Sequence, residues 1–326
     1  MFSQPYEELY NRILDVTALV HVPIKLFAMV IVFRYSPKDM RYLSFFLLNA
    51  MFWNFMANFL FTFIHLYPMY PAECFRADGI VSLLIDDELF GQVMFSLIFI
   101  AIINCAIALS YTFPYRYFVF AYPHRMGRVR PMTIFTFCGA VHLFASAFVV
   151  CSFFVWRESY NSYPEQRDLP RRELLFCFQP HGWLKNTIVA TFLTLIFLVT
   201  AVAITFCILL FRSIRRQEGI LERNFLDSHR RVLVTMIAVT SVPITLGGIP
   251  LVVALITAAR PDLPYAQEIC MVCIVILTNH GTMYATAMIL VLKPCRTAAH
   301  SVISSLLCFK NHPVQPINLY GVRHVK

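Results

Sequence analysis

Seven long apolar stretches, separated by short polar connections, constrain this chain more than any other feature. A helix needs ~20 mostly apolar residues to cross ~30 Å of hydrocarbon, and every stretch is long enough. Apolar residues occur on all sides of each stretch instead of alternating with polar ones, which favours helices over the strands of a membrane barrel. The predicted spans are residues 13–33, 42–66, 89–113, 133–155, 187–211, 232–255 and 269–292.

The composition supports a membrane protein. Of the 326 residues, 59% are hydrophobic and 14% are charged, whereas soluble proteins average ~45–50% and ~25%. This excludes a disordered chain, a disulfide-rich secreted scaffold and an ordinary soluble enzyme. The sequence therefore predicts an all-α membrane protein, a seven-transmembrane helix bundle that forms one domain over residues 1–326, with a tail at 293–326.

The basic residues are divided unevenly between the two sets of connections. Eighteen of the 27 Lys and Arg residues lie in the connections after the first, third and fifth spans or in the tail, together with four acidic residues. The other connections hold 8 basic and 14 acidic residues. Because Lys- and Arg-rich connections stay in the cytosol, the N-terminus is predicted outside and the C-terminus cytosolic. The net charge of +9 then reflects topology and contact with anionic membrane lipid, and predicts no nucleic-acid partner.

Most of the ten cysteines lie within spans. Only Cys74 and Cys177 fall clearly in outside connections, which face an oxidising compartment. A disulfide between them would tie the second outer connection across the mouth of the bundle; two unpaired thiols are the alternative. Cys308 lies near the end of an amphipathic cytosolic segment and is a candidate for lipidation by palmitoylation.

The sequence carries no recognisable catalytic motif. It lacks a His-Glu-X-X-His zinc site, a phosphate-binding Gly-X-X-X-X-Gly-Lys loop and a Gly-X-Ser-X-Gly elbow. No acidic residue lies in the middle of a span, which counts against a proton-coupled transporter and an intramembrane protease. We therefore expect no enzyme, no cofactor and no metal site.

Lys25, half-way along the first span, is the single deeply placed charge. A lysine at the bilayer centre costs ~2.5–3.5 kcal/mol on insertion scales. It could bind an anionic ligand group together with His21, one turn earlier on the same face. Alternatively, it extends toward the membrane surface or bonds to Asn, Ser or backbone carbonyls.

Several amides and one histidine lie within the other spans. Asn104 and His280 are candidate ligand contacts, since a neutral histidine can donate and accept a hydrogen bond at once. Hydrogen bonds between helices, worth ~0.6–2 kcal/mol each in membranes, are the default interpretation of such residues. Asn54 and Asn58, four residues apart, share one helix face.

The sixth span contains Pro243 and Pro250, so this helix should be bent. A bent helix beside the most basic connection is a natural moving part. That connection, residues 212–231, mixes arginines such as Arg230 and Arg231 with apolar residues. It could bind a cytosolic partner; a solvated basic loop is the alternative.

Short motifs at the inner end of the third span, within the last span and directly after it resemble those of nematode serpentine chemoreceptors, particularly class H. The motif Phe113-Pro114-Tyr115-Arg116-Tyr117 resembles Phe-Glu-Asn-Arg-Tyr of that class. His280-Gly281 and Lys293-Pro294-Cys295-Arg296 resemble its His-Gly and closing Pro-Tyr-Arg. Pro114, Tyr115 and Cys295 depart from the pattern, and the missing glutamate removes a partner for Arg116.

The resemblance implies a chemosensory G-protein-coupled receptor in the plasma membrane, in sensory cilia of chemosensory neurons. A small extracellular chemical cue would enter among the outer halves of the helices, beneath the second outer connection, and activate a heterotrimeric G protein. A ligand-gated ion channel, with its N-terminus inside, and a small-solute transporter are the alternatives. The residues expected to act in coupling are Arg116, Tyr117, Pro243, Pro250, Arg230, Arg231 and Arg296.

Overall fold

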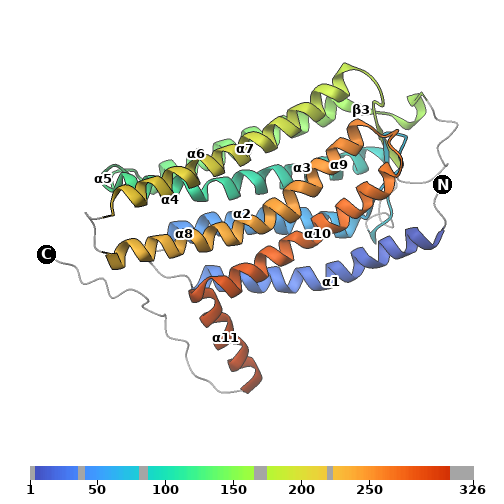
Figure 1. Cartoon of the computed structure of the whole chain (residues 1–326). Helices are drawn as coiled ribbons and strands as arrows, with labels where there is room; N and C mark the ends of the chain where they lie inside the picture. Colours follow the sequence, from blue (N-terminus) through green and yellow to red (C-terminus); the bar gives the residue numbers. More distant parts are fainter. Residues whose placement is uncertain (1–3, 36–40, 81–86, 165–174, 219–222, 309–326) are drawn as a thin grey trace.

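A computed structural model describes residues 4–35, 41–80, 87–164, 175–218 and 223–308. Within these ranges, seven helical segments are long and apolar enough to cross a membrane, which confirms the predicted seven-helix bundle. The segments lie side by side along one common direction (Figure 1). They are α1 (Gln4–Tyr35), α2 (Arg41–Ile64), α3 (Glu88–Ser110) with α4 (Thr112–Ala121), α6 (Pro131–Trp156), α7 (Trp183–Arg216), α8 (Arg223–Pro243) with η5 (Ile244–Gly248) and α9 (Ile249–Ala259), and α10 (Ala266–Val291).

The predicted spans match these segments apart from their ends, and one difference, in the third, changes where a candidate residue lies. We predicted that it ends at Phe113, whereas α4 continues the helix to Ala121. Arg116 therefore lies in a helix and not in a connection. Pro114 does not stop the helix because it stands in the first turn of α4, where a missing N–H breaks no helical hydrogen bond.

A small antiparallel sheet closes one end of the bundle, which we call the sheet end. Its strand order is β1-β2-β4-β3, and every residue of β1, β2 and β4 is buried. Cys74 in β2 stands opposite Cys177 in β4, and a disulfide joins them. The strands are β1 (Leu66–Pro68), β2 (Cys74–Ala77), β3 (Arg157–Glu158) and β4 (Leu175–Phe178).

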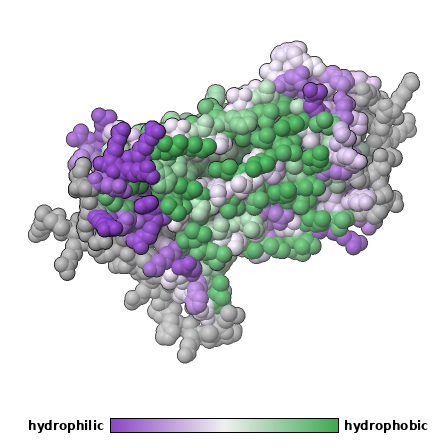
Figure 2. All heavy atoms as spheres, viewed as in Figure 1, coloured by the Kyte–Doolittle hydropathy of each residue, from purple (hydrophilic) through white to green (hydrophobic). Residues whose placement is uncertain are grey.

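The opposite end, which we call the basic end, carries the short helix α5 (Pro123–Met126) and the helix α11 (Lys293–Cys308). In Figure 1, α11 turns away from the bundle after α10. The side chain of Cys308 and residues 309–326 lie outside the described part, so the lipidation prediction falls there too. Figure 2 shows an apolar surface around the middle of the bundle and hydrophilic residues gathered at its two ends.

Two hydrophobic clusters hold the bundle together. The cluster at the sheet end is rich in aromatic residues such as Phe95, Phe153 and Trp156, and the sheet packs into it. The cluster at the basic end is mainly aliphatic and joins residues such as Ile31 and Leu233 from distant helices. The functional site described below lies at the level where the two clusters meet.

Candidate functional site

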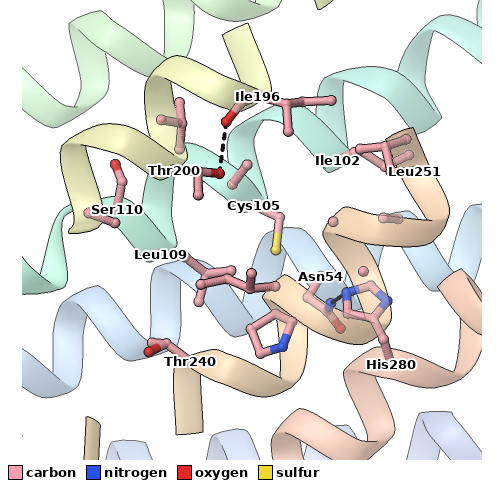
Figure 3. A pocket seen from close by; sticks show the side chains of 18 of the residues that line it. Asn54, Ile102, Cys105, Leu109, Ser110, Ile196, Thr200, Thr240, Leu251 and His280 are labelled. Atoms are coloured by element: carbon pink, nitrogen blue, oxygen red, sulfur yellow. Dashed lines mark hydrogen bonds between the residues drawn. The ribbon is translucent and has the colours of Figure 1, made fainter. Parts of the chain in front are cut away.

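A cavity of about 120 Å³ lies in the middle of the bundle. We call it the mid-bundle cavity. Its walls come from α2, α3, α7, the η5–α9 segment and α10, and most of its lining side chains are apolar (Figure 3). The lining residues include Asn54, Ile102, Cys105, Leu109, Ile196, Val199, Thr200, Ala203, Thr240, Pro243, Ile244, Gly247, Gly248, Leu251, Leu277 and His280.

The polar part of the wall is a pair of side chains, Asn54 and His280. His280 Nδ1 lies within hydrogen-bond distance of the Leu277 carbonyl, so it carries the proton and donates. His280 Nε2 is then the acceptor for the Asn54 side-chain amide, at 2.7 Å. The pair links α2 to α10 and gives the cavity a fixed polar corner, whereas the hydroxyls of Ser110, Thr200 and Thr240, which also line it, donate to backbone carbonyls of their own helices.

Lys25 lies behind this pair and does not line the cavity. Its side chain is buried, and Nζ donates to the Asn54 backbone carbonyl at 3.4 Å. Gly281 makes room for it, because a Cβ there would overlap both Asn54 Oδ1 and Lys25 Nζ. We call Lys25, Asn54, His280 and Gly281 the Lys25 network; it joins α1, α2 and α10.

The network also touches the sixth span. A Cβ added to Gly247 would stand 3.1 Å from His280 Cδ2, so the imidazole packs directly against the backbone of η5. This segment is a π-helix, in which the Ile249 N–H donates to the Ile244 carbonyl. Such a bulge bends a helix and often marks a functional position. Pro243 and Pro250, which predicted the bend, flank it.

Hydroxyl groups supply extra hydrogen bonds around the bend. Thr240 Oγ1 donates to the Met236 carbonyl at 2.7 Å, and Thr245 Oγ1 donates to the Ser241 carbonyl at 2.8 Å. In a membrane helix, Ser and Thr side chains can satisfy backbone groups that an irregular turn would leave without a partner. The sixth span can therefore stay bent within the hydrocarbon.

Of the four predicted ligand contacts, only His280 lines the mid-bundle cavity. His21 is fully buried and pairs with Thr62 Oγ1 at 2.9 Å. Asn104 is also fully buried; it donates to Ser146 Oγ at 2.9 Å and accepts from His142 Nδ1 at 2.6 Å. Lys25, His21 and Asn104 thus bond to the protein, as the structural alternatives predicted, and their binding role stays a prediction.

The predicted coupling residues gather toward the basic end or flank the bend. Arg116 is partly buried and shares a small hollow with His229 of α8. The Tyr117 ring packs on Phe206 of α7, with 5.7 Å between ring centroids. Arg230 and Arg231 are exposed on α8, and Arg296 is exposed on α11.

A second cavity of about 60 Å³ lies beneath the sheet. We call it the aromatic cavity. Phenylalanines and Trp156 form a large part of its wall, and it shares Ile102, Leu251 and Leu277 with the mid-bundle cavity. Those three side chains therefore form the partition between the two. The phenylalanines in its wall are Phe61, Phe75, Phe95, Phe99, Phe153 and Phe192.

Buried ion pairs fasten the sheet to the helices. Glu73, at the edge of the aromatic cavity, pairs with Lys185 of α7, and both side chains are buried. Burial raises the pKa of the Glu73 carboxyl to about 7, although the neighbouring Lys185 ammonium opposes the rise. Arg76 pairs with Asp78 and, at 3.1 Å, with Glu7 of α1. Among the residues that the structure describes, no three His, Cys, Asp or Glu side chains gather as a metal site requires.

The whole arrangement can be compared with known families. The family model described as "Serpentine type 7TM GPCR chemoreceptor Srh" matches residues 5–305. The chain belongs to this family of serpentine chemoreceptors. The match runs through all seven spans and confirms the resemblance drawn from the short motifs. A search of curated proteins found no match.

Sequence reasoning missed part of the site. It treated Asn54 as structural, noted Gly247 only as part of the sixth span that should bend, and did not single out Cys105, although all three line the cavity of this Srh receptor. The four-residue spacing of Asn54 and Asn58 was the available signal: both are buried, and Asn58 donates to the Thr278 carbonyl at 2.6 Å. Nothing in the sequence indicates that Gly247 lies against His280.

Proposed function

We propose that this Srh-family receptor binds a small, mostly apolar cue in the mid-bundle cavity and activates a heterotrimeric G protein at its basic end. One observation carries the proposal: the cavity is bounded at once by the Lys25 network and by the bent segment η5, which touch through His280 and Gly247. A molecule in the cavity therefore contacts both a polar pair joining two helices and the part of the sixth span best suited to move.

The size and lining of the cavity define the class of cue. An engineered apolar cavity of ~150 Å³ holds benzene, and the mid-bundle cavity measures about 120 Å³. A molecule of roughly five to seven non-hydrogen atoms fits. The best small ligands gain up to ~1.5 kcal/mol per atom, so micromolar affinity is attainable. The Asn54–His280 pair offers one polar contact, which suits a ketone, an aldehyde or an alcohol.

Coupling follows from a difference in affinity between two states of the bundle. A cue that fits better when η5 has moved away from His280 shifts the population toward that state. The sixth span then pivots between Pro243 and Pro250, and its inner part carries Arg230 and Arg231 away from Arg116. The G protein binds the surface that this movement exposes.

We place the sheet end outside the cell and the basic end in the cytosol. Two features support this orientation: 18 of the 27 basic residues fall on the basic side, and the disulfide between Cys74 and Cys177 lies at the sheet end, as an oxidising compartment requires. For a receptor of environmental cues, the sensory cilia of chemosensory neurons are the corresponding location.

The first test is topology, with an epitope tag at each end stained in intact and in permeabilised cells. The receptor needs the amino tag outside and the carboxyl tag inside. The reverse orientation would contradict G-protein coupling and favour the ligand-gated channel.

The second test is function. Cells expressing the receptor are exposed to a panel of alcohols, ketones and aldehydes of four to ten carbons, and G-protein activation is recorded. We expect at least one response that is lost in Arg116→Ala at equal surface expression. No response across the panel, with surface expression confirmed, would contradict the proposal.

A further inference from the structure

The sheet end of the bundle is closed above the mid-bundle cavity. All residues of β2 and β4 are buried, and the disulfide and the Glu73–Lys185 pair fasten them in place. Below them, aromatic side chains pack into the sheet-end cluster. The partition of Ile102, Leu251 and Leu277 then separates the mid-bundle cavity from the aromatic cavity. In the described residues, a molecule coming from the sheet end meets three successive layers.

The side wall of the cavity is much thinner between α7 and η5. Here Thr200 and Ala203 of α7 are only partly buried, although both line the cavity. Across from them, Ile244 is 43% exposed on the outside of the bundle. Figure 3 shows α7, with Ile196 and Thr200, on one side of the cavity and the segment with Leu251 across from it. In the middle of a membrane span, an exposed side chain faces lipid.

Gly248 leaves this wall without a side chain. It lines the cavity, and a Cβ built on it would meet no atom within 4 Å. The opposite wall differs, since Asn54 and Leu277 are 2% and 5% exposed. The thin part also coincides with the π-helix, a type of turn that is frequent at functional sites.

We propose that the cue reaches the mid-bundle cavity from the lipid phase, through the wall between α7 and η5, and is therefore a neutral lipophilic molecule that concentrates in the bilayer. The inference rests on the proposed function and adds to it a route and a ligand class. It differs from the expected access beneath the second outer connection. Each CH₂ group favours the bilayer over water roughly fourfold, so every added carbon raises the enrichment of the cue in the bilayer, while its polar group lowers it.

The route can be tested with a probe that cannot leave the membrane. The full-length receptor is placed in nanodiscs containing phosphatidylcholine with a diazirine half-way along one acyl chain. After illumination, adducts are mapped by mass spectrometry. Cys105 and Leu251 are the diagnostic positions, because both are buried and both line the cavity. A parallel sample receives a water-soluble diazirine alcohol of five carbons, which can approach from either phase.

Glycine variants supply matched comparisons. Gly248→Trp should fill the thin wall and reduce lipid-derived adducts on Cys105 and Leu251 at least tenfold. Gly139→Trp is the control, since Gly139 also has open space around it but lies exposed on α6. Ile244→Ala removes side-chain atoms from the thin wall and so enlarges the opening. It should raise the yield of lipid-derived adducts severalfold. It keeps the test informative if the tryptophan variant does not fold.

The outcomes distinguish the proposed access route from the proposed binding site. Lipid-derived adducts in the cavity that respond to Gly248→Trp and not to Gly139→Trp support the route. Adducts from the alcohol alone would overturn the route and leave the proposed function standing. Adducts from neither probe would overturn the site itself, and with it the proposed function.

Discussion

The two ends of the bundle are stabilised in different ways. Among the described residues, the sheet-end cluster buries seven phenylalanines and the basic-end cluster buries two. Aromatic pairs contribute ~0.5–1.5 kcal/mol beyond their buried area, and the sheet end adds a disulfide, the buried Glu73–Lys185 pair and the partly buried ion pairs of Arg76. The basic end relies on aliphatic packing and exposes its described arginines apart from Arg116, which is partly buried. The difference indicates a fixed frame at one end and a movable surface at the other, with the mid-bundle cavity between them.

The largest effect that tests this difference is expected at the buried ion pair between Glu73 and Lys185. At a pH above the Glu73 pKa of about 7, Lys185→Met leaves the Glu73 carboxylate buried without its partner, which should lower the stability by about 3–5 kcal/mol. Adding Glu73→Gln should recover much of the loss, because no unpaired charge remains. Arg230→Met, at an exposed position of the basic end, is the control and should change the stability by less than ~0.5 kcal/mol. Thermal unfolding in detergent gives the melting temperatures of all three variants. Equal melting temperatures for Lys185→Met and Arg230→Met would contradict a sheet end that is fixed by its buried ion pair.

The disulfide sharpens the same comparison locally. It joins residues 103 positions apart, and replacing both cysteines by serine should cost about 2–4 kcal/mol. Hydrogen exchange should rise in β2 and β4 and stay unchanged in α8 and α11. An equal rise along the whole chain would mean that the two ends unfold as one unit.

The Lys25 network lies between the two ends of the bundle, and Gly281 is the position at which an added methyl group would disturb it directly. Gly281→Ala forces a methyl group onto Asn54 and Lys25, which should cost about 1–3 kcal/mol and reduce any cue-induced G-protein response. Gly139→Ala should do neither, since its surroundings are open. Asn54→Ala, combined with Gly281→Ala, should restore part of the stability but not the response. A response unchanged in Gly281→Ala at matched expression would separate the network from signalling.

The smallest effect is the pH dependence of the sheet end. Glu73 has a pKa of about 7 in the folded protein against an ordinary value of 4.5, so the folded state holds a proton that the unfolded state releases. Stability should therefore fall as the pH rises, by about 1 kcal/mol between pH 6 and pH 8. Glu73→Gln should melt at nearly the same temperature across this range. A wild-type melting temperature that rises with pH would contradict the assignment.

The spans were predictable because hydrocarbon dictates both their length and their composition. The bend in the sixth span was also predictable, because Pro243 and Pro250 each lack the backbone N–H that a regular helix uses as a donor. The sheet was not: its strands are two to four residues long, too short for a pattern, and their pairing depends on helices distant in sequence. The cavity was only partly predictable, because Asn54 and Gly247 acquire their roles from His280, more than 30 residues further along the chain.

The aromatic wall beneath the sheet has a spectroscopic consequence. The chain has three tryptophans, and they occupy three different environments. Trp156 lines the aromatic cavity and donates to the Gln179 carbonyl at 3.0 Å, Trp183 is 77% exposed, and Trp53 packs on His142. Replacing Trp53 and Trp183 by phenylalanine would leave Trp156 as the one tryptophan, at the boundary between the sheet end and the cavities. The fluorescence of Trp156 would then follow changes at that boundary without an added label.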